Sequence, residues 1–169
     1  MSLIEIGKKY PSSKNISGFI QLYEKYFTSL KNLKINILEI GIENGDSLRI
    51  WREYFTNANI CGIDIDKKDF KINNTEILQG DQSDKNFLKT LIDKYKNFDI
   101  IIDDGSHQAK HIIASFKFLF PAKSTIVGSK SEKEIGVSVC IFSFIPGPEI
   151  IKGTLMPPSI ASHLPLCKG

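Results

Sequence analysis

ILEIGIENGDSLRIW, residues 37–51, is the stretch that decides how the rest of this chain is interpreted. An apolar, strand-forming run that contains Glu39 passes through Gly41 and Gly45 and turns directly into an amphipathic segment. Glycines allow a tight turn and the close approach of a ligand, and the helix behind them directs unpaired N–H groups at that ligand. The stretch therefore predicts a strand–loop–helix unit that binds a nucleotide-like cofactor.

Apolar periodicity on both sides of this unit predicts alternating helices and strands. Helices are expected over residues 17–30, 46–55, 84–95 and 107–120, and strands over residues 34–40, 59–64, 76–79 and 98–103. Asp84 is expected to cap its helix, and Pro121 is expected to end the last one. Alternation of this kind gives a parallel sheet with helices on both faces, so the predicted fold class is α/β, doubly wound and mostly parallel, which is Rossmann-like.

The composition of the chain changes near Pro121. Residues 1–120 contain every Asn, Asp, Arg and Tyr, whereas the remainder contains six of the seven Pro, an apolar run over 135–145 and a Pro/Ser-rich end. The chain, at 169 residues, is long enough for one domain. We therefore predict a core over residues 1–121. Residues 122–169 form an atypical tail, either a flexible end or a non-native continuation produced by a frameshift, altered splicing or truncation.

Bulk properties exclude several classes of protein. The net charge of +3 is spread along the chain with no basic block, which argues against nucleic acid as a partner. The sequence shows neither a signal peptide nor an apolar run long enough to span a membrane. Cys61, Cys140 and Cys167 match neither a metal spacing nor a disulfide framework, which is typical of the reducing cytoplasm. The oligomeric state is left open.

Acidic residues stand near the end of every predicted strand. They are Glu39, Asp64, Asp81 and the two aspartates of DDGSH, residues 103–107. Ligands of doubly wound sheets bind beyond the carboxyl ends of the strands, where like charges gathered together require a bound ligand or cation as compensation. Asp64 could accept hydrogen bonds from ribose hydroxyls, and Asp81 could contact an adenine or a neighbouring amide. Taken singly, each could equally be a cap or turn residue.

Two cofactors suit such a site, a nicotinamide dinucleotide and S-adenosylmethionine. Counted from Gly41, the dinucleotide fingerprint GxGxxG places Glu43 and Asp46 where it needs its second and third glycines. An acid there would lie against a pyrophosphate, whereas S-adenosylmethionine has no phosphate and carries a positive sulfonium. The sequence favours S-adenosylmethionine, and a dinucleotide-dependent oxidoreductase is the alternative.

The four segments 37–51, 57–66, 80–84 and 98–107, in this order, resemble a class I S-adenosylmethionine-dependent methyltransferase. Within that class they are most similar to the macrocin-type sugar O-methyltransferases of macrolide biosynthesis, and the resemblance covers about residues 9–121. It implies roles for seven residues: Glu39, Gly41 and Gly45 in the cofactor loop, Asp64 at the ribose, Asp81 near the adenine, Asp104 as a Mg²⁺ ligand and His107 as the general base.

The resemblance implies O-methylation of a hydroxylated small molecule, most simply a sugar. A hard cation would lower the pKa of the acceptor hydroxyl, and His107 would take its proton during methyl transfer. His111 lies four residues beyond His107 and could suggest a zinc pair, but Gln108 replaces the glutamate of an HExxH helix. His163, in the tail, is assigned no role.

After Pro121 the chain departs from the pattern of the family it resembles. The Gly-Gly turn and the Glu-Asp pair that completes the metal site are absent, and Glu132 and Glu134 are not assigned these roles. Ser13 and Ser17 stand where relatives often have Asp and His. The C-terminal strands are therefore expected to be incomplete, cofactor affinity to be weakened and turnover to be low or absent. A non-catalytic methyltransferase-like domain is thus a further alternative.

Overall fold

The computed structural model describes residues 1–16, 19–119 and 139–142. The helices in these ranges are α1 (Leu3–Gly7), α2 (Ser13–Ile16), α3 (Phe19–Phe27), the 3-10 turn η1 (Thr28–Leu30), α4 (Asp46–Tyr54), α5 (Lys85–Tyr95) and α6 (Ala109–Leu119). The strands are β1 (Asn36–Ile40), β2 (Asn59–Asp64), β3 (Thr75–Gln79), β4 (Ile100–Asp103) and β5 (Val139–Phe142). None of the helices so described is long and apolar enough to cross a membrane.

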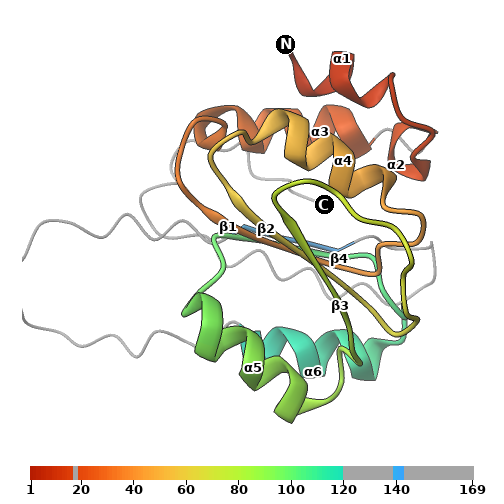
Figure 1. Ribbon diagram of the computed structural model, residues 1–169, viewed down its shortest axis with the longest axis vertical. Helices are drawn as coiled ribbons and strands as arrows, with labels where there is room; N and C mark the ends of the chain where they lie inside the picture. Colours follow the sequence, from red (N-terminus) through yellow and green to blue (C-terminus); the bar gives the residue numbers. More distant parts are fainter. Residues whose placement is uncertain (17–18, 120–138, 143–169) are drawn as a thin grey trace, which may run out of the picture.

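The strands form one parallel sheet in the order β3-β2-β1-β4-β5. Figure 1 shows α1, α3 and α4 over one face of this sheet and α5 and α6 over the other. The predicted α/β, doubly wound and parallel fold class is therefore confirmed. The chain moves outward from β1 to β2 and β3 and then returns to the other side of β1 as β4. The strand order thus reverses between β1 and β4, which is where sheets of this kind bind ligands.

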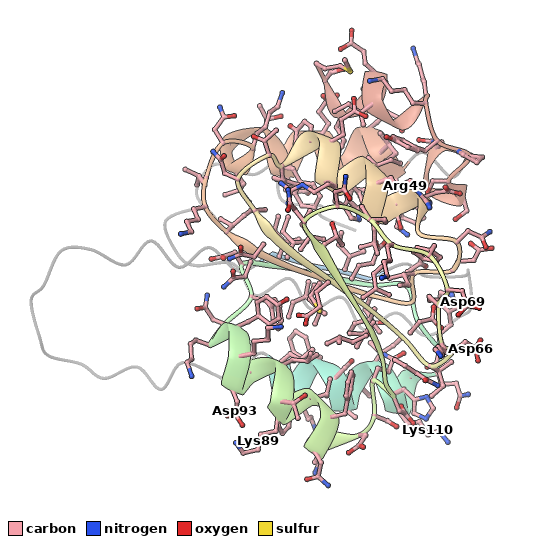
Figure 2. The ribbon with its side chains drawn as sticks, viewed as in Figure 1. Arg49, Asp66, Asp69, Lys89, Asp93 and Lys110 are labelled. Atoms are coloured by element: carbon pink, nitrogen blue, oxygen red, sulfur yellow. The ribbon has the colours of Figure 1, made fainter. Side chains whose placement is uncertain are left out.

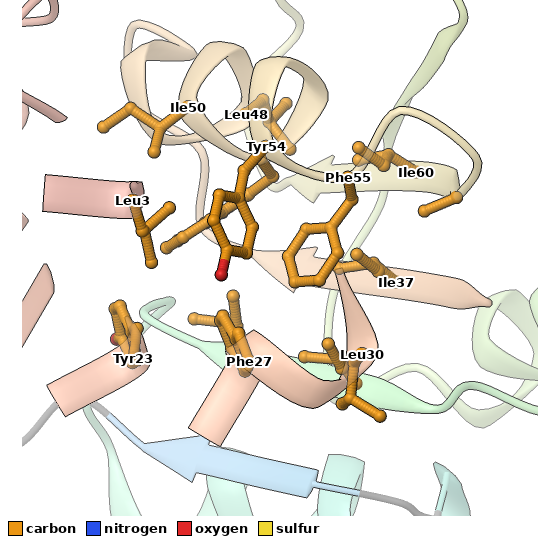
Figure 3. Packing of buried hydrophobic residues seen from close by; sticks show 14 of the residues in the cluster. Leu3, Tyr23, Phe27, Leu30, Ile37, Leu48, Ile50, Tyr54, Phe55 and Ile60 are labelled. Atoms are coloured by element: carbon orange, nitrogen blue, oxygen red, sulfur yellow. The ribbon is translucent and has the colours of Figure 1, made fainter. Parts of the chain in front are cut away.

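Alternate strand residues enter two separate cores, as a sheet covered on both faces requires. Ile37 of β1 packs toward α3 and α4, whereas its neighbour Leu38 packs toward α5 and α6. The first core is rich in aromatic rings: Figure 3 shows Tyr23 and Phe27 of α3 beneath the residues of α4. The indole of Trp51 meets the rings of Tyr23 and Phe27 edge-on, at centroid distances of 5.3 and 5.8 Å. This packing fixes α4 firmly against the sheet.

Several predicted boundaries are confirmed, and others are wrong for identifiable reasons. Strand β2 spans the predicted residues 59–64, and Asp84 caps α5 by accepting a hydrogen bond from the N–H of Asn86 at 2.8 Å. The last helix begins at Ala109 and not at His107, because His107 has a left-handed backbone with φ 56°. The helix predicted over 17–30 is in fact α3 followed by the 3-10 turn η1.

A fifth strand lies beside β4. Val139–Phe142 lies within the apolar run noted at 135–145 and pairs in parallel with β4, from Ile100↔Val139 to Asp103↔Phe142. The edge of β4 is therefore covered by one further strand, which is compatible with the expectation that the C-terminal strands are incomplete. The remainder of the predicted tail, including His163 and Cys167, lies outside the described residues, as does Ser17.

Candidate functional site

A pocket of about 820 Å³ lies at the carboxyl ends of β1, β2, β3 and β4. Its volume falls within the ~300–1,000 Å³ of ordinary small-molecule sites. In Figure 2, Asp66 after β2 and Lys110 at the start of α6 mark this end of the molecule. Five short segments line the pocket, together with four single residues: Pro11–Lys14, Ile40–Asn44, Ile63–Asp66, Gly80–Gln82 and Asp104–Gln108, with Asp46, Ser47, Lys68 and His111.

The seven residues proposed from the sequence converge on this edge of the sheet, but they do not all reach the pocket. Five of them line it: Gly41, Asp64, Asp81, Asp104 and His107. The other two lie behind it. Glu39 is fully buried, and Gly45 is covered by the ring of Phe70. The predicted glycine loop thus borders the pocket, and its acid and its second glycine lie below the pocket surface.

The Glu39 carboxylate joins three elements beneath the pocket. Its Oε2 accepts hydrogen bonds from Ser47 Oγ at 2.9 Å and from Trp51 Nε1 at 3.0 Å, both on α4. Its Oε1 lies 3.0 Å from Lys14 Nζ of α2. Because all four side chains are buried, these contacts exclude water, and Glu39 sets the position of α4 relative to β1.

The two loop glycines are required by backbone geometry. Gly41 and Gly45 have φ values of 79° and 77°, in the left-handed region that glycine adopts without strain. A Cβ on Gly41 would collide with the backbone of Asp104, and a Cβ on Gly45 would collide with the Phe70 ring. Gly41 thus allows the loop after β1 to touch the loop after β4, which closes the pocket on that side.

Asp64 fastens the end of β2 to the glycine loop. One oxygen, Oδ2, accepts from the backbone N–H of Ile42 at 3.0 Å and of Glu43 at 3.2 Å, and it also pairs with Lys68 Nζ at 3.1 Å. The other oxygen, Oδ1, accepts from the N–H of Asp66 at 3.0 Å. Burial raises the pKa of Asp64, but these hydrogen bonds and the ammonium outweigh burial, so the pKa lies below its ordinary value. The carboxylate is therefore ionised in the pocket.

Asp81 lines the pocket and also shapes the turn after β3. Its Oδ1 accepts hydrogen bonds from both the N–H and the hydroxyl of Ser83, each at 2.7 Å. These bonds lower the pKa of Asp81. The turn-forming role and the ligand role considered for this residue are compatible, because the other oxygen of the carboxylate is not used by Ser83.

Gln82 and Asp103 form a buried clamp that the sequence did not reveal. Gln82 donates from Nε2 to both oxygens of Asp103, at 3.2 and 3.0 Å, and accepts at Oε1 from the N–H of Ser106 at 2.8 Å. Ser115 Oγ of α6 donates to Asp103 at 3.1 Å. Burial raises the pKa of Asp103 despite these bonds. The clamp holds the loops after β3 and β4 together, and no pattern in the sequence signalled the partnership of an amide in the turn after β3 with an aspartate at the end of β4.

Lys14 is a second residue that sequence reasoning missed. Its ammonium lies 2.6 Å from Asp104 Oδ2 and 3.0 Å from Glu39 Oε1, and its side chain is 4% exposed. Burial lowers the pKa of Lys14, but the two carboxylates raise it more, so the net pKa is above its ordinary value. Its helix, α2, has four residues, too few to show a periodic pattern.

The two histidines of the pocket have different neighbours. His107 Nε2 lies 3.9 Å from Asp104 Oδ1, whereas His111 Nδ1 lies 3.0 Å from the hydroxyl of Ser106. Among the residues that the structure describes, no three His, Cys, Asp or Glu side chains are grouped so that they could hold a metal ion. The paired-histidine zinc site considered from the sequence thus lacks a third ligand within these residues.

Comparison with known proteins gives consistent matches, although no family model matches the chain. It is 40% identical over 112 residues to the 8-demethyl-8-(2-methoxy-alpha-L-rhamnosyl)-tetracenomycin-C 3'-O-methyltransferase of Streptomyces olivaceus, covering 62% of this chain and 29% of that protein. It is 36% identical over 129 residues to the mycinamicin VI 2''-O-methyltransferase of Micromonospora griseorubida, covering 70% and 32%. The same identity relates it to the demethylmacrocin O-methyltransferase of Streptomyces fradiae, covering 70% and 33%. The chain thus spans about a third of the length of these relatives.

Comparison with solved structures gives matches to the same kind of methyltransferase. The MycE methyltransferase of the mycinamycin biosynthetic pathway, in complex with Mg, SAH and mycinamycin VI, superposes with a TM-score of 0.66. The sequence identity is 34%, and the match covers 72% of this chain and 36% of that one. The same enzyme with Mg and SAH alone gives the same score in two crystal forms.

Proposed function

Since this chain is homologous to macrocin-type sugar O-methyltransferases over about two thirds of its length, we propose that it binds S-adenosylmethionine in the pocket at the carboxyl edge of its sheet. We further propose that it serves O-methylation of a hydroxyl group on a small molecule, most simply a sugar. The observation that carries the proposal is the joining of Asp64 to the glycine loop through the N–H groups of Ile42 and Glu43. It places an ionised carboxylate beside the loop, inside a pocket of suitable volume.

The half of the pocket beyond β2 suits an adenosine group. Asp64 Oδ1 accepts one internal hydrogen bond, from Asp66, and keeps acceptor capacity for ribose hydroxyls. The next residue, Ile65, lines the pocket and is 62% exposed. Covering it with a flat purine would remove this apolar surface from water, at roughly 25 cal/mol per Å². Asp81, which also lines the pocket, is the proposed partner of the adenine amino group.

The charge of the glycine loop distinguishes the two cofactors. Glu43 and Asp46 both line the pocket at the start of α4, where a dinucleotide would place its pyrophosphate. Asp46 is paired with Arg49 at 3.1 Å, so the Glu43 carboxylate is the main charge there that would repel phosphate and attract the sulfonium and ammonium groups of S-adenosylmethionine. This arrangement supports the methyl donor over a dinucleotide-dependent oxidoreductase.

His107 is the proposed general base for the acceptor hydroxyl. It lines the pocket, and its Nε2 faces Asp104 Oδ1 at 3.9 Å. A nearby carboxylate orients the imidazole and stabilises the imidazolium that forms when the ring takes a proton. The sulfonium of the bound cofactor supplies the methyl group. The chain's own residues position the donor and the hydroxyl and accept the proton.

The predicted Mg²⁺ fits the described residues poorly. Mg²⁺ prefers about six oxygen ligands in an octahedral arrangement. Asp104 is the candidate ligand, and its Oδ2 is already paired with Lys14 at 2.6 Å. Within residues 1–16, 19–119 and 139–142 no cluster of three ligating side chains could hold the ion. No step of the proposed reaction is therefore assigned to a metal.

Titration calorimetry of the folded chain with S-adenosylmethionine and with S-adenosylhomocysteine tests the proposal. Binding, followed by transfer of a labelled methyl group to demethylmacrocin or to rhamnosyl tetracenomycin C, would support a methyltransferase. Binding without transfer would favour the non-catalytic methyltransferase-like alternative. A folded chain that binds neither compound, or one that enhances NADH fluorescence on mixing, would overturn the proposed cofactor.

A further inference from the structure

At the acidic edge of the sheet, the protein itself supplies a buried cation, the ammonium group of Lys14. Lys14 Nζ lies between Glu39 Oε1, at 3.0 Å, and Asp104 Oδ2, at 2.6 Å. Glu39 is fully buried, Lys14 is 4% exposed, and Asp104 is 23% exposed toward the pocket. The ammonium therefore joins the central strand β1 to the loop that follows β4, the strand beyond the switch point, where the carboxylates gather.

A divalent cation at Asp104 would compete with this ammonium. The ammonium already lies 2.6 Å from Asp104 Oδ2, and in a poorly solvated place two cations on one carboxylate repel each other strongly. Burial of the charges in the pair Lys14–Glu39 is tolerated only because they neutralise each other. Moving Lys14 away to admit a metal would leave Glu39 buried without a counter-charge, since its other contacts, from Ser47 and Trp51, are neutral hydrogen bonds.

We infer that Lys14 takes the place of the divalent cation predicted at Asp104 and acts as a positioning residue for that carboxylate. Its ammonium fixes Oδ2, so that Oδ1 remains directed toward His107. The charge compensation that the acidic strand ends require is thus supplied from α2, by the chain itself. The inference rests on the contacts of Lys14 and does not require that the chain transfers methyl groups.

Mn²⁺ binding, followed by electron paramagnetic resonance on the full chain, is the direct test. The unaltered chain is expected to show no Mn²⁺ site that is sensitive to Asp104. In Lys14→Met, which keeps most of the length of the side chain and removes its charge, Glu39 and Asp104 lose the ammonium that they share. This variant is expected to gain an Mn²⁺ site and a rise in thermal unfolding temperature on addition of Mg²⁺. A purely structural lysine would give destabilisation without any gain of metal response.

Two control variants make the result specific. Adding Asp104→Asn to Lys14→Met should abolish the gained site. Lys68→Met removes the ammonium from Asp64, the other lysine-paired carboxylate of the pocket, and should gain no site. An Mn²⁺ site in the unaltered chain that Asp104→Asn abolishes would overturn the inference. So would a folded Lys14→Met chain without a metal response. The comparison of the unaltered chain with Asp104→Asn does not require any substitution of Lys14. The inference is therefore testable even if Lys14→Met fails to fold.

Discussion

Trp51 donates its indole N–H to Glu39 Oε2 at 3.0 Å, and both side chains are fully buried. The carboxylate that the sequence assigns to cofactor binding is therefore first a structural anchor for α4. The charge balance of this anchor depends on Lys14, whose ammonium lies on the other oxygen.

Replacing Glu39 by Gln should destabilise the fold strongly. The substitution keeps the shape but leaves Lys14 buried with half of its counter-charge, and removing one partner of a buried pair costs roughly 3–5 kcal/mol. The measurement is the free energy of unfolding in urea. The control is Asp93→Asn on α5, whose partner Lys89 is exposed, as Figure 2 shows. That exposed pair should contribute about 0–1 kcal/mol. Equal losses in the two variants would contradict the buried role of Glu39.

Alanine variants of the two loop glycines should respond differently when Phe70 is also replaced. Gly45→Ala places a methyl group against the Phe70 side chain, whereas Gly41→Ala places it against the backbone of Asp104. Both variants carry left-handed strain of roughly 1–2 kcal/mol, and the collisions add about 1–3 kcal/mol. Adding Phe70→Leu should recover part of the loss in Gly45→Ala and none in Gly41→Ala. Urea unfolding of the single and double variants measures this; recovery in both would show that Phe70 is not the obstacle.

Asp64 and Asp103 should give pH dependences of opposite sign. The pKa of Asp64 is lowered from 3.8, so its contribution to stability is present above that pH and is lost as the pH falls through the lowered value. The pKa of Asp103 is raised from 3.8, so its contribution is present at low pH and is lost as the pH rises through the raised value.

Urea unfolding of each Asp→Asn variant against the unaltered chain, at about pH 6 and about pH 3.5, separates the two cases. The stability advantage of the unaltered chain over Asp64→Asn should shrink on acidification, and its advantage over Asp103→Asn should grow. A difference that does not change with pH would show that the carboxylate in question has the same pKa in the folded and unfolded chains.

His107 and His111 should differ in their effect on methyl transfer. Both line the pocket, but only His107 is paired with Asp104. Once transfer to demethylmacrocin is established, His107→Ala should lower the rate about 10²–10⁴-fold with little change in cofactor affinity, because a general base acts on the acceptor. His111→Ala is the matched control and should retain most of the rate. A larger loss in His111→Ala would reassign the base.

Local sequence signals were sufficient to predict much of the fold. The ends of β2 and the cap at Asp84 are fixed by their own residues and neighbours, so the sequence predicted them. The predicted start of α6, at His107, was wrong because the loop imposes a left-handed backbone on that residue. Nothing in its residue type requires that conformation. Asp64, Asp81 and Asp104 were found because strand ends of a parallel sheet meet at one edge.

The unpredicted part of the site consists of partnerships between distant segments. Gln82 meets Asp103, and Lys14 meets Asp104, through contacts that are set by how the helices and loops pack. No periodicity or spacing encodes such pairs. The sequence therefore predicted that the acidic edge needs a bound ligand or cation as compensation, but it could not show that the ammonium of Lys14 lies between two of these carboxylates.

The pairing of Lys14 with Asp104 also has a consequence for the order in which the molecule assembles. The two residues are 90 positions apart, so their contact closes a long loop. Such contacts form late, since the entropy of loop closure must be overcome before they contribute. During synthesis, β1, α4 and β2 can pack while Glu39 still lacks part of its final environment. The contacts of Lys14 are completed only when β4 docks beside β1 and brings Asp104 to the ammonium, so a nascent chain that ends before Asp104 cannot hold the complete site.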